Sequence, residues 1–89
     1  MKKLLRKKQF EKHYHQRILP NKKLDKQFEE RLSLFVRGKR GYPLNDHELT
    51  GKLKGKRAFS ITPDIRVVYQ ETTAAIIFLD IGAHTQVYK

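Results

Sequence analysis

The sequence predicts an α+β fold in which two N-terminal helices pack on a small, mainly antiparallel sheet. Apolar residues in the first half recur at helical spacing, whereas the second half has short apolar runs separated by turn signals. Helical segments precede a run of strands instead of alternating with them, which is typical of an α+β arrangement. With 89 residues, we expect one domain spanning 1–89. The expected order is β-α-α-β-β-β, with room for a short extra edge strand.

A short strand and a helical hairpin are expected in the first half. Residues 1–5 carry Leu4 and Leu5 as the apolar content of the strand. The first helix is predicted from three residues at i, i+4 and i+8, namely Phe10, Tyr14 and Ile18. Pro20 and Asn21 end this helix and open the next. The second helix follows from the spacing of Leu24, Phe28, Leu32 and Phe35, and Gly38 and Gly41 close it.

The second half is predicted to begin with a basic loop over 39–55, which contains glycines and Pro43. Three strands are then indicated, at Phe59–Ile61, Arg66–Tyr69 and Ala75–Leu79, with turns between them. The third is apolar throughout, which favours a strand buried on both faces. Gly82 is expected to end it, and Val87 and Tyr88 to add an edge piece.

Charge is the dominant compositional feature. Lys and Arg number 20 against 9 acidic residues, which gives a net charge of +11. Such an excess attracts phosphate backbones, and also membrane surfaces or acidic proteins, although charge can simply keep a small protein soluble. The chain has no cysteine, which favours the cytoplasm. No apolar run reaches the length of a membrane span, and the two leucines before Arg6 are too few for a signal peptide.

Several residues are candidates for RNA chemistry. Cleavage of RNA requires a base for the 2′-hydroxyl, a cation for the phosphate and an acid for the leaving oxygen. His47 and His84 lie near glycines, where side chains are accessible, and Arg66 opens a strand after a turn. A solvated histidine, or an arginine paired with Asp64 or Glu71, is the alternative. No metal is expected, since cysteine is absent and no histidine pair has zinc-ligand spacing.

A dense basic patch is expected to bind RNA or the ribosome; it comprises Lys52, Lys54, Lys56 and Arg57. Tyr42 and Phe59 lie nearby in the sequence, and cations with aromatic rings suit single-stranded RNA. A solvated loop is the alternative interpretation of such a charge run.

The order of the second-half motifs resembles the RelE/ParE superfamily of bacterial toxins, and its YafQ-like branch in particular. The motifs are Asp46-His47-Glu48-Leu49-Thr50-Gly51, Gly55-Lys56-Arg57, Ile61-Thr62-Pro63-Asp64, Arg66-Val67-Val68-Tyr69 and Ile81-Gly82-Ala83-His84-Thr85-Gln86-Val87-Tyr88. The resemblance implies a toxin of a type II toxin–antitoxin pair that cleaves mRNA on the ribosome without a metal. It also implies an acidic antitoxin partner, no small-molecule cofactor and no membrane. The catalytic residues that it implies are His47, Asp64, Arg66, His84 and Tyr88.

Two positions depart from this branch. YafQ-like toxins carry an aspartate and a histidine on the strand before the Pro-Asp turn, where this chain has Ala58 and Ser60. RelE-like toxins carry lysines there, which are absent as well. Within an enzyme, either His47, His84 and Asp64 suffice, or Lys52, Lys54 or Arg57 substitutes for the missing pair. Two alternative functions also stay open: a non-enzymatic, ParE-like inhibitor of DNA gyrase, and a weakened toxin that only binds its antitoxin or RNA.

Overall fold

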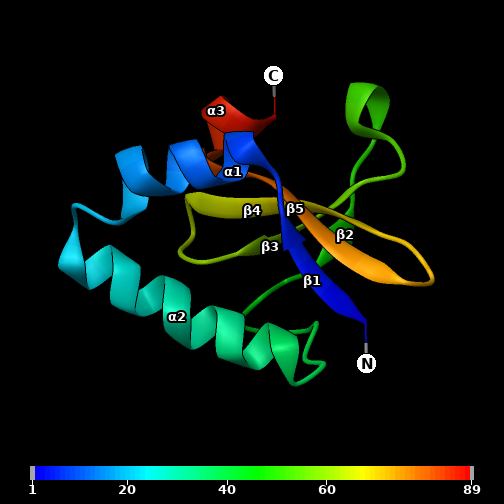
Figure 1. Ribbon diagram of the computed structural model, residues 1–89, viewed down its shortest axis with the longest axis horizontal. Helices are drawn as coiled ribbons and strands as arrows, with labels where there is room; N and C mark the ends of the chain where they lie inside the picture. Colours follow the sequence, from blue (N-terminus) through cyan, green and yellow to red (C-terminus); the bar gives the residue numbers. More distant parts are fainter. Residues whose placement is uncertain (1, 89) are drawn as a thin grey trace.

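The computed structural model describes residues 2–88, which form a five-stranded mixed sheet with helices on both faces (Figure 1). The elements in chain order are β1 (Lys3–Arg6), α1 (Lys8–His13), a π-helical segment (Tyr14–Ile18), α2 (Lys22–Val36), β2 (His47–Glu48), a 3-10 turn (Gly51–Leu53), β3 (Arg57–Ser60), β4 (Ile65–Glu71), β5 (Ala75–Ala83) and α3 (His84–Val87). The α+β prediction is confirmed, and so is the order of its main elements.

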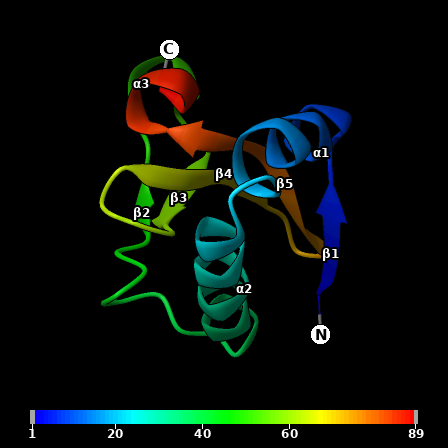
Figure 2. The same cartoon turned by 90° about the vertical axis from the view of Figure 1, so that its left-hand side faces the viewer.

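The sheet is antiparallel except at one edge. Its strand order is β1-β5-β4-β3-β2, so β3, β4 and β5 form the predicted meander. β1 pairs in parallel with β5, and β2 pairs antiparallel with β3. The apolar run of β5 therefore lies in the interior of the sheet, between β1 and β4, as predicted. Figures 1 and 2 show α2 on one side of the sheet and α3 on the other.

The main core lies between the two N-terminal helices and the sheet. Phe10 and Ile18 of the first helical stretch and Phe28 and Phe35 of α2 pack with strand residues, all of them almost fully buried. The strand residues of this core are Phe59, Val67, Tyr69, Phe78 and Ile81, and Leu44 and Ile61 join them from outside the strands. The predicted apolar faces of both helices are thus the faces that the core buries.

The ends of α2 follow the predicted signals. The Asn21 side chain accepts a hydrogen bond of 3.1 Å from the backbone N–H of Leu24, which satisfies one of the free donors of the first turn. After Val36 the chain reverses at Gly38, whose φ of +95° suits glycine and costs other residues strain.

Three local predictions were wrong. β5 continues one residue past Gly82, because Gly82 pairs with Arg66 of β4 and has no side chain to obstruct the neighbouring Arg17. Val87 belongs to helix α3 and Tyr88 follows that helix, so they form no edge strand. The extra edge strand is instead β2, inside the segment that was predicted to be loop 39–55.

Candidate active site

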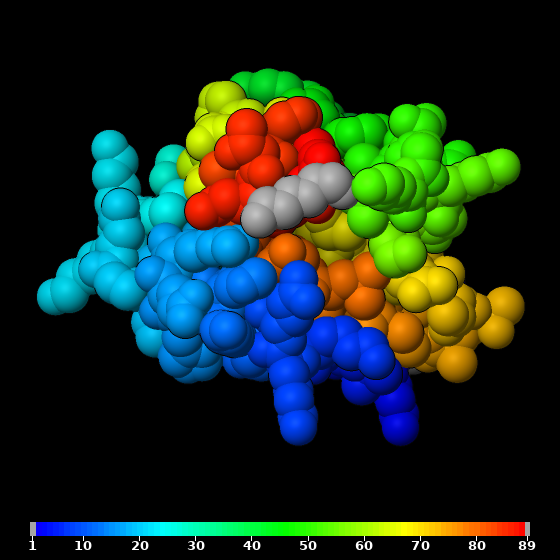
Figure 3. All heavy atoms as spheres, turned by 90° about the horizontal axis from the view of Figure 1, so that it is seen from above, coloured from blue at the N-terminus to red at the C-terminus, as the bar shows by residue number. Residues whose placement is uncertain are grey.

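The sheet face opposite α2 carries a second, smaller apolar cluster. Its buried members are Leu49, Ala58, Val68 and Val87, and Leu53, Leu79 and Tyr88 pack against them half-buried. Because side chains alternate along a strand, Ser60 and Arg66 share this face with Ala58 and Val68. The cluster joins three parts of the chain: the segment around β2, the central strands, and α3. Figure 3 shows the green loop and the red C-terminal segment on the same side of the molecule.

His47 lies on this face at the edge of the sheet. It pairs with Ala58 across β2 and β3, and directly paired residues point to the same face. Its Nδ1 atom lies 3.0 Å from the backbone oxygen of Asn45, which orients the ring. A cavity of about 430 Å³ is lined by His47, Glu48, Leu49, Thr50, Lys52, Leu53 and Tyr88. The cavity therefore connects the predicted loop histidine with the predicted C-terminal aromatic residue.

His84 begins α3, where β5 ends. Its backbone N–H donates to the backbone oxygen of Asp64 at 3.0 Å and lies 3.4 Å from the Asp64 carboxylate. The imidazole ring meets the Tyr88 ring edge to face, with centroids 4.4 Å apart. The Gln86 side chain closes the turn by accepting a bond of 2.7 Å from the N–H of Ala83. Asp64, His84 and Tyr88 are thus brought together although they come from separate motifs.

Arg66 borders the same group of residues. Its Nη2 atom donates to the backbone oxygen of Pro63 at 3.0 Å, while its Nε atom is buried without a hydrogen-bond partner among residues 2–88. Burial raises the pKa of the Tyr88 hydroxyl, and the nearby positive charge of Arg66 opposes that increase. The Tyr88 hydroxyl is buried beside Arg66, and the side-chain hydrogen bond from Arg66 likewise opposes the increase in the Tyr88 pKa. Arg66 and Tyr88 thus form a buried polar pair at this end of the candidate site.

The basic residues predicted to bind RNA separate in space. Lys52 lines the cavity beside His47. Lys56 lines a neighbouring cavity of about 440 Å³ together with Lys7 and Lys8 of the N-terminal segment. Lys54 lies on a different part of the loop surface, beside Glu48 and Gly51. Lysines from two distant segments therefore border the face that carries the histidines. The sequence did not predict Lys7 and Lys8 as binding residues, because they lie near the N-terminus, far from the motifs of the second half.

Arg57 points away from this face. It pairs with Tyr69, a residue of the main core, and both its Nε and Nη2 atoms lie 2.8 Å from the same carboxylate oxygen of Asp46. The hydrogen bond to Asp46 raises the pKa of Arg57. Its charge is already matched by a carboxylate, which leaves it poorly placed to bind phosphate.

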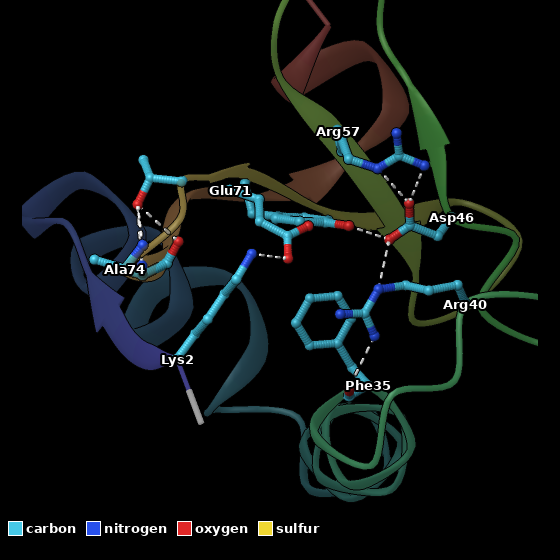
Figure 4. Close-up of polar contacts among 10 residues, drawn as sticks. Lys2, Phe35, Arg40, Asp46, Arg57, Glu71 and Ala74 are labelled. Carbon is cyan, nitrogen blue, oxygen red and sulfur yellow. Dashed lines mark hydrogen bonds and ion pairs between the residues drawn. The ribbon is translucent and has the colours of Figure 1, made fainter.

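Asp46 is a buried structural residue whose role the sequence pattern did not predict. Its side chain is fully buried and is bonded by Arg57 and by the Tyr69 hydroxyl, with Arg40 Nε at 3.8 Å (Figure 4). Burial, followed by the bond to Asp46, raises the pKa of Tyr69. Since Asp46 directly precedes His47, this network anchors the segment that presents the loop histidine.

The two departures from the family pattern have different surroundings. Ala58 is completely buried in the smaller apolar cluster, so nothing of it is open to a ligand. Ser60 is also mostly buried, but it lines a cavity of about 360 Å³ together with Arg66. At neutral pH a serine hydroxyl cannot replace an imidazole as acid or base, so any proton transfer must come from other residues.

The aromatic residues expected near the basic patch also differ. Phe59 is fully buried in the main core and stacks on Phe35, with ring centroids 4.4 Å apart. Tyr42, in contrast, is 83% exposed. Of the two, only Tyr42 offers a ring face to a base.

Two further properties concern residues 2–88 alone. None of their helices combines the length and the apolar character needed to cross a membrane. In this part of the chain, no group of three or more histidine, aspartate or glutamate side chains is arranged to hold a metal ion.

Comparisons with known proteins agree with this architecture. The family described as "Bacterial toxin of type II toxin-antitoxin system, YafQ" matches residues 2–89. No curated protein sequence matches significantly. Among solved structures, YafQ from E. coli strain BL21(DE3) is 20% identical, with a TM-score of 0.80 and all of both chains covered. A copper-bound mutant toxin from Helicobacter pylori is 30% identical, with a TM-score of 0.75 over 98% of this chain and 99% of that one. The toxin in the E. coli DinJ-YafQ toxin-antitoxin complex is 22% identical, with a TM-score of 0.76 over 99% and 98%.

Proposed function

Because the chain belongs to the YafQ family of bacterial toxins of type II toxin–antitoxin systems, we propose that it is an mRNA endoribonuclease that acts on the ribosome. One observation carries this proposal: Asp64, Arg66, His84 and Tyr88 meet at the end of β5, on the face that also carries His47. Two imidazoles and a guanidinium supply the groups that cleavage of a phosphodiester requires, and this chemistry needs no metal.

The reaction follows from these groups. One imidazole accepts the proton of the 2′-hydroxyl, and the 2′-oxygen then attacks the adjacent phosphorus. The bond from phosphorus to the 5′-oxygen breaks, and the second imidazole donates a proton to that leaving oxygen. Arg66 holds the phosphate while negative charge grows on its oxygens. Asp64 positions His84 through the backbone bond, and Tyr88 contacts the ring of His84.

The lysines around this face fit a nucleic-acid partner. Lys52 and Lys56, with Lys7 and Lys8, border the two neighbouring cavities of the active-site face. The net charge of +11 favours binding to rRNA and mRNA, with an affinity that falls as salt rises. Action on the ribosome places the protein in the cytoplasm.

An acidic antitoxin is the expected protein partner. The E. coli toxin of similar fold is described in complex with the antitoxin DinJ. A largely disordered acidic segment that folds on this chain would neutralise the basic face and cover His47 and His84. Binding of such a partner explains how a cell tolerates the toxin.

Growth arrest and mRNA cleavage test the function directly. The variants His84→Ala and Arg66→Ala are expressed without antitoxin, and cuts in translated mRNA are mapped by primer extension. Both variants are expected to relieve growth arrest and to lose the cuts, by roughly a hundredfold or more in rate, since each removes a group that acts in the transition state.

His15→Ala and Arg37→Ala are matched controls, because both side chains are exposed and lie outside the candidate active site. Circular dichroism verifies that each variant is folded. Full toxicity in both His84→Ala and Arg66→Ala would reject the assigned roles. DNA damage without mRNA fragments would instead support the gyrase-inhibitor alternative.

A further inference from the structure

A third cavity, of about 360 Å³, lies next to the candidate active site and has no role in the reaction described above. It is lined by Arg31, Tyr42, Pro43, Asn45, Ser60, Ile61, Thr62, Pro63 and Arg66. Arg66 belongs to both places, since it lines this cavity and also influences the ionisation of Tyr88. Arg66 therefore links this cavity to the candidate active site.

We propose that this cavity is a nucleotide subsite in which Arg31 and Arg66 bind a phosphate and Tyr42 stacks on the base. This assignment rests on the proposed function in that it takes RNA as the ligand. It adds a binding site for the nucleotide next to the scissile bond, in which Arg31 and Tyr42, from outside the candidate catalytic set, act together with Arg66.

Two buried donors without partners are the first reason. The Nε atoms of Arg31 and Arg66 are both buried, and neither has a hydrogen-bond partner within residues 2–88. Such donors are rare in folded proteins, because each loses its water without gaining a replacement. Both arginines line the same cavity, so their guanidinium groups can offer donors to one ligand there. The planar donors of arginine match the oxygens of a phosphate.

The charge of the cavity is the second reason. Arg31 and Arg66 are the charged side chains among the described residues that line it, and no carboxylate lines it with them. This differs from Arg57 and Arg40, whose charges lie beside the buried carboxylate of Asp46. The positive charges of Arg31 and Arg66 can therefore attract an anion from outside, while Arg66 Nη2 also donates to the backbone oxygen of Pro63.

The exposed ring of Tyr42 is the third reason. A tyrosine side chain that is 83% exposed buries little surface in the folded protein. An aromatic ring at the edge of a cavity can instead stack on an unpaired base. A carboxylate from a protein partner would use the arginines but would have no use for the ring. The combination of ring and guanidinium groups therefore favours a nucleotide over an acidic peptide.

Binding of a short single-stranded RNA tests the subsite. The probe is a fluorescent 2′-O-methyl RNA, which cannot be cleaved because its 2′-oxygen is blocked, and affinity is measured by anisotropy across a salt series. Arg31→Met keeps an unbranched apolar stem and removes the charge. It is expected to weaken binding about tenfold. The slope of the logarithm of the binding constant against the logarithm of salt concentration should become shallower by about one.

The ring is tested separately. Tyr42→Ala is expected to weaken binding by roughly tenfold, whereas Tyr42→Phe keeps the stacking surface and should bind like the wild type. Single abasic nucleotides are placed in turn along the RNA. When the abasic nucleotide occupies the subsite, no base is left to stack on Tyr42, so Tyr42→Ala should no longer lower the affinity.

Arg37→Met is the matched control, since Arg37 is an exposed arginine beyond the end of α2 and is not part of the cavity lining. It should weaken binding by no more than about twofold, as expected of a distant surface charge. If Arg31→Met unfolds, Arg31→Lys gives the second measurement: it keeps the charge but loses the planar donors, and should bind with intermediate affinity.

Wild-type affinity in both Arg31→Met and Tyr42→Ala would overturn the subsite. Loss of binding in Arg31→Met with no effect of Tyr42→Ala would show a simple anion site and would also overturn the nucleotide assignment. Because the probe cannot be cleaved, these results are independent of nuclease activity. RNA binding that depends on Arg31 and Tyr42, in a protein that does not cleave mRNA, would retain the subsite and reject the nuclease. Cleavage of mRNA without any dependence of RNA binding on Arg31 and Tyr42 would reject the subsite alone.

Discussion

Replacement of Asp46 by asparagine is expected to destabilise the protein far more than replacement of any exposed aspartate. The Asp46 side chain is fully buried and is bonded by Arg57 through two guanidinium nitrogens at 2.8 Å and by the Tyr69 hydroxyl. Asparagine keeps the shape but removes the charge. Its amide group also brings a donor to a place where the neighbouring groups are themselves donors.

The magnitude follows from these bonds. A hydrogen bond to a charged group contributes about 1.5–3 kcal/mol, and breaking a buried pair by changing one partner costs about 3–5 kcal/mol. The Arg57 side chain is 38% exposed, so water can solvate part of the released charge. The lower end, about 3 kcal/mol, is therefore expected. For a domain of this size, that corresponds to a fall in Tm of roughly 12–24 °C.

Thermal and urea unfolding followed by circular dichroism measure this effect. Asp64→Asn is the control, because Asp64 is exposed and should change the stability by less than about 0.5 kcal/mol. Tyr69→Phe removes only the hydroxyl partner, and the double variant Asp46→Asn with Tyr69→Phe reports the coupling between the two groups. A Tm within a few degrees of the wild type for Asp46→Asn would refute the view that this carboxylate anchors the segment before His47.

Two further predictions concern the active-site face. Ser60→His should raise the rate of mRNA cleavage by roughly tenfold to a hundredfold, because it adds an imidazole at a cavity that Arg66 also lines. Thr62→His, at the same cavity, is the control. Equal cleavage rates in the two variants would contradict the reasoning. Gly82→Ala should lower stability by about 1–2 kcal/mol, because its Cβ would lie 2.5 Å from Arg17 Nη1 and 2.8 Å from Gln86 Oε1, both at the ends of side chains that can move. Gly41→Ala, in open space, should be nearly neutral in the same unfolding assay, and equal losses in the two variants would argue against a steric cause.

The sequence alone was sufficient for the fold class, because the signals are local. The spacing of Phe10 and Ile18, and of Phe28 and Phe35, depends only on the helical repeat, and these four residues are the ones that the core buries. Asn21 and Gly38 likewise act on their own neighbours along the chain. The apolar run of β5 predicted an interior strand for the same reason, since burial on both faces requires apolar residues on both.

Motif order predicted a set of candidate site residues, but not how they meet in space. Asp64 and His84 are far apart in the sequence, and only the pairing of β4 with β5 places the His84 N–H on the Asp64 carbonyl. The short helix after β5 was missed because its few residues contain no helical repeat long enough to detect.

The roles of the basic residues were decided by tertiary structure. Lys56 and Arg57 are neighbours in one charge run, yet they point to opposite faces of the sheet because side chains alternate along the chain there. Lys56 borders a cavity on the active-site face, and Arg57 pairs with the buried Asp46. Arg31 and Arg66 converge on one cavity from α2 and β4. Residue types show which charges a chain carries, but only packing determines which of those charges are matched internally and which remain available to a ligand.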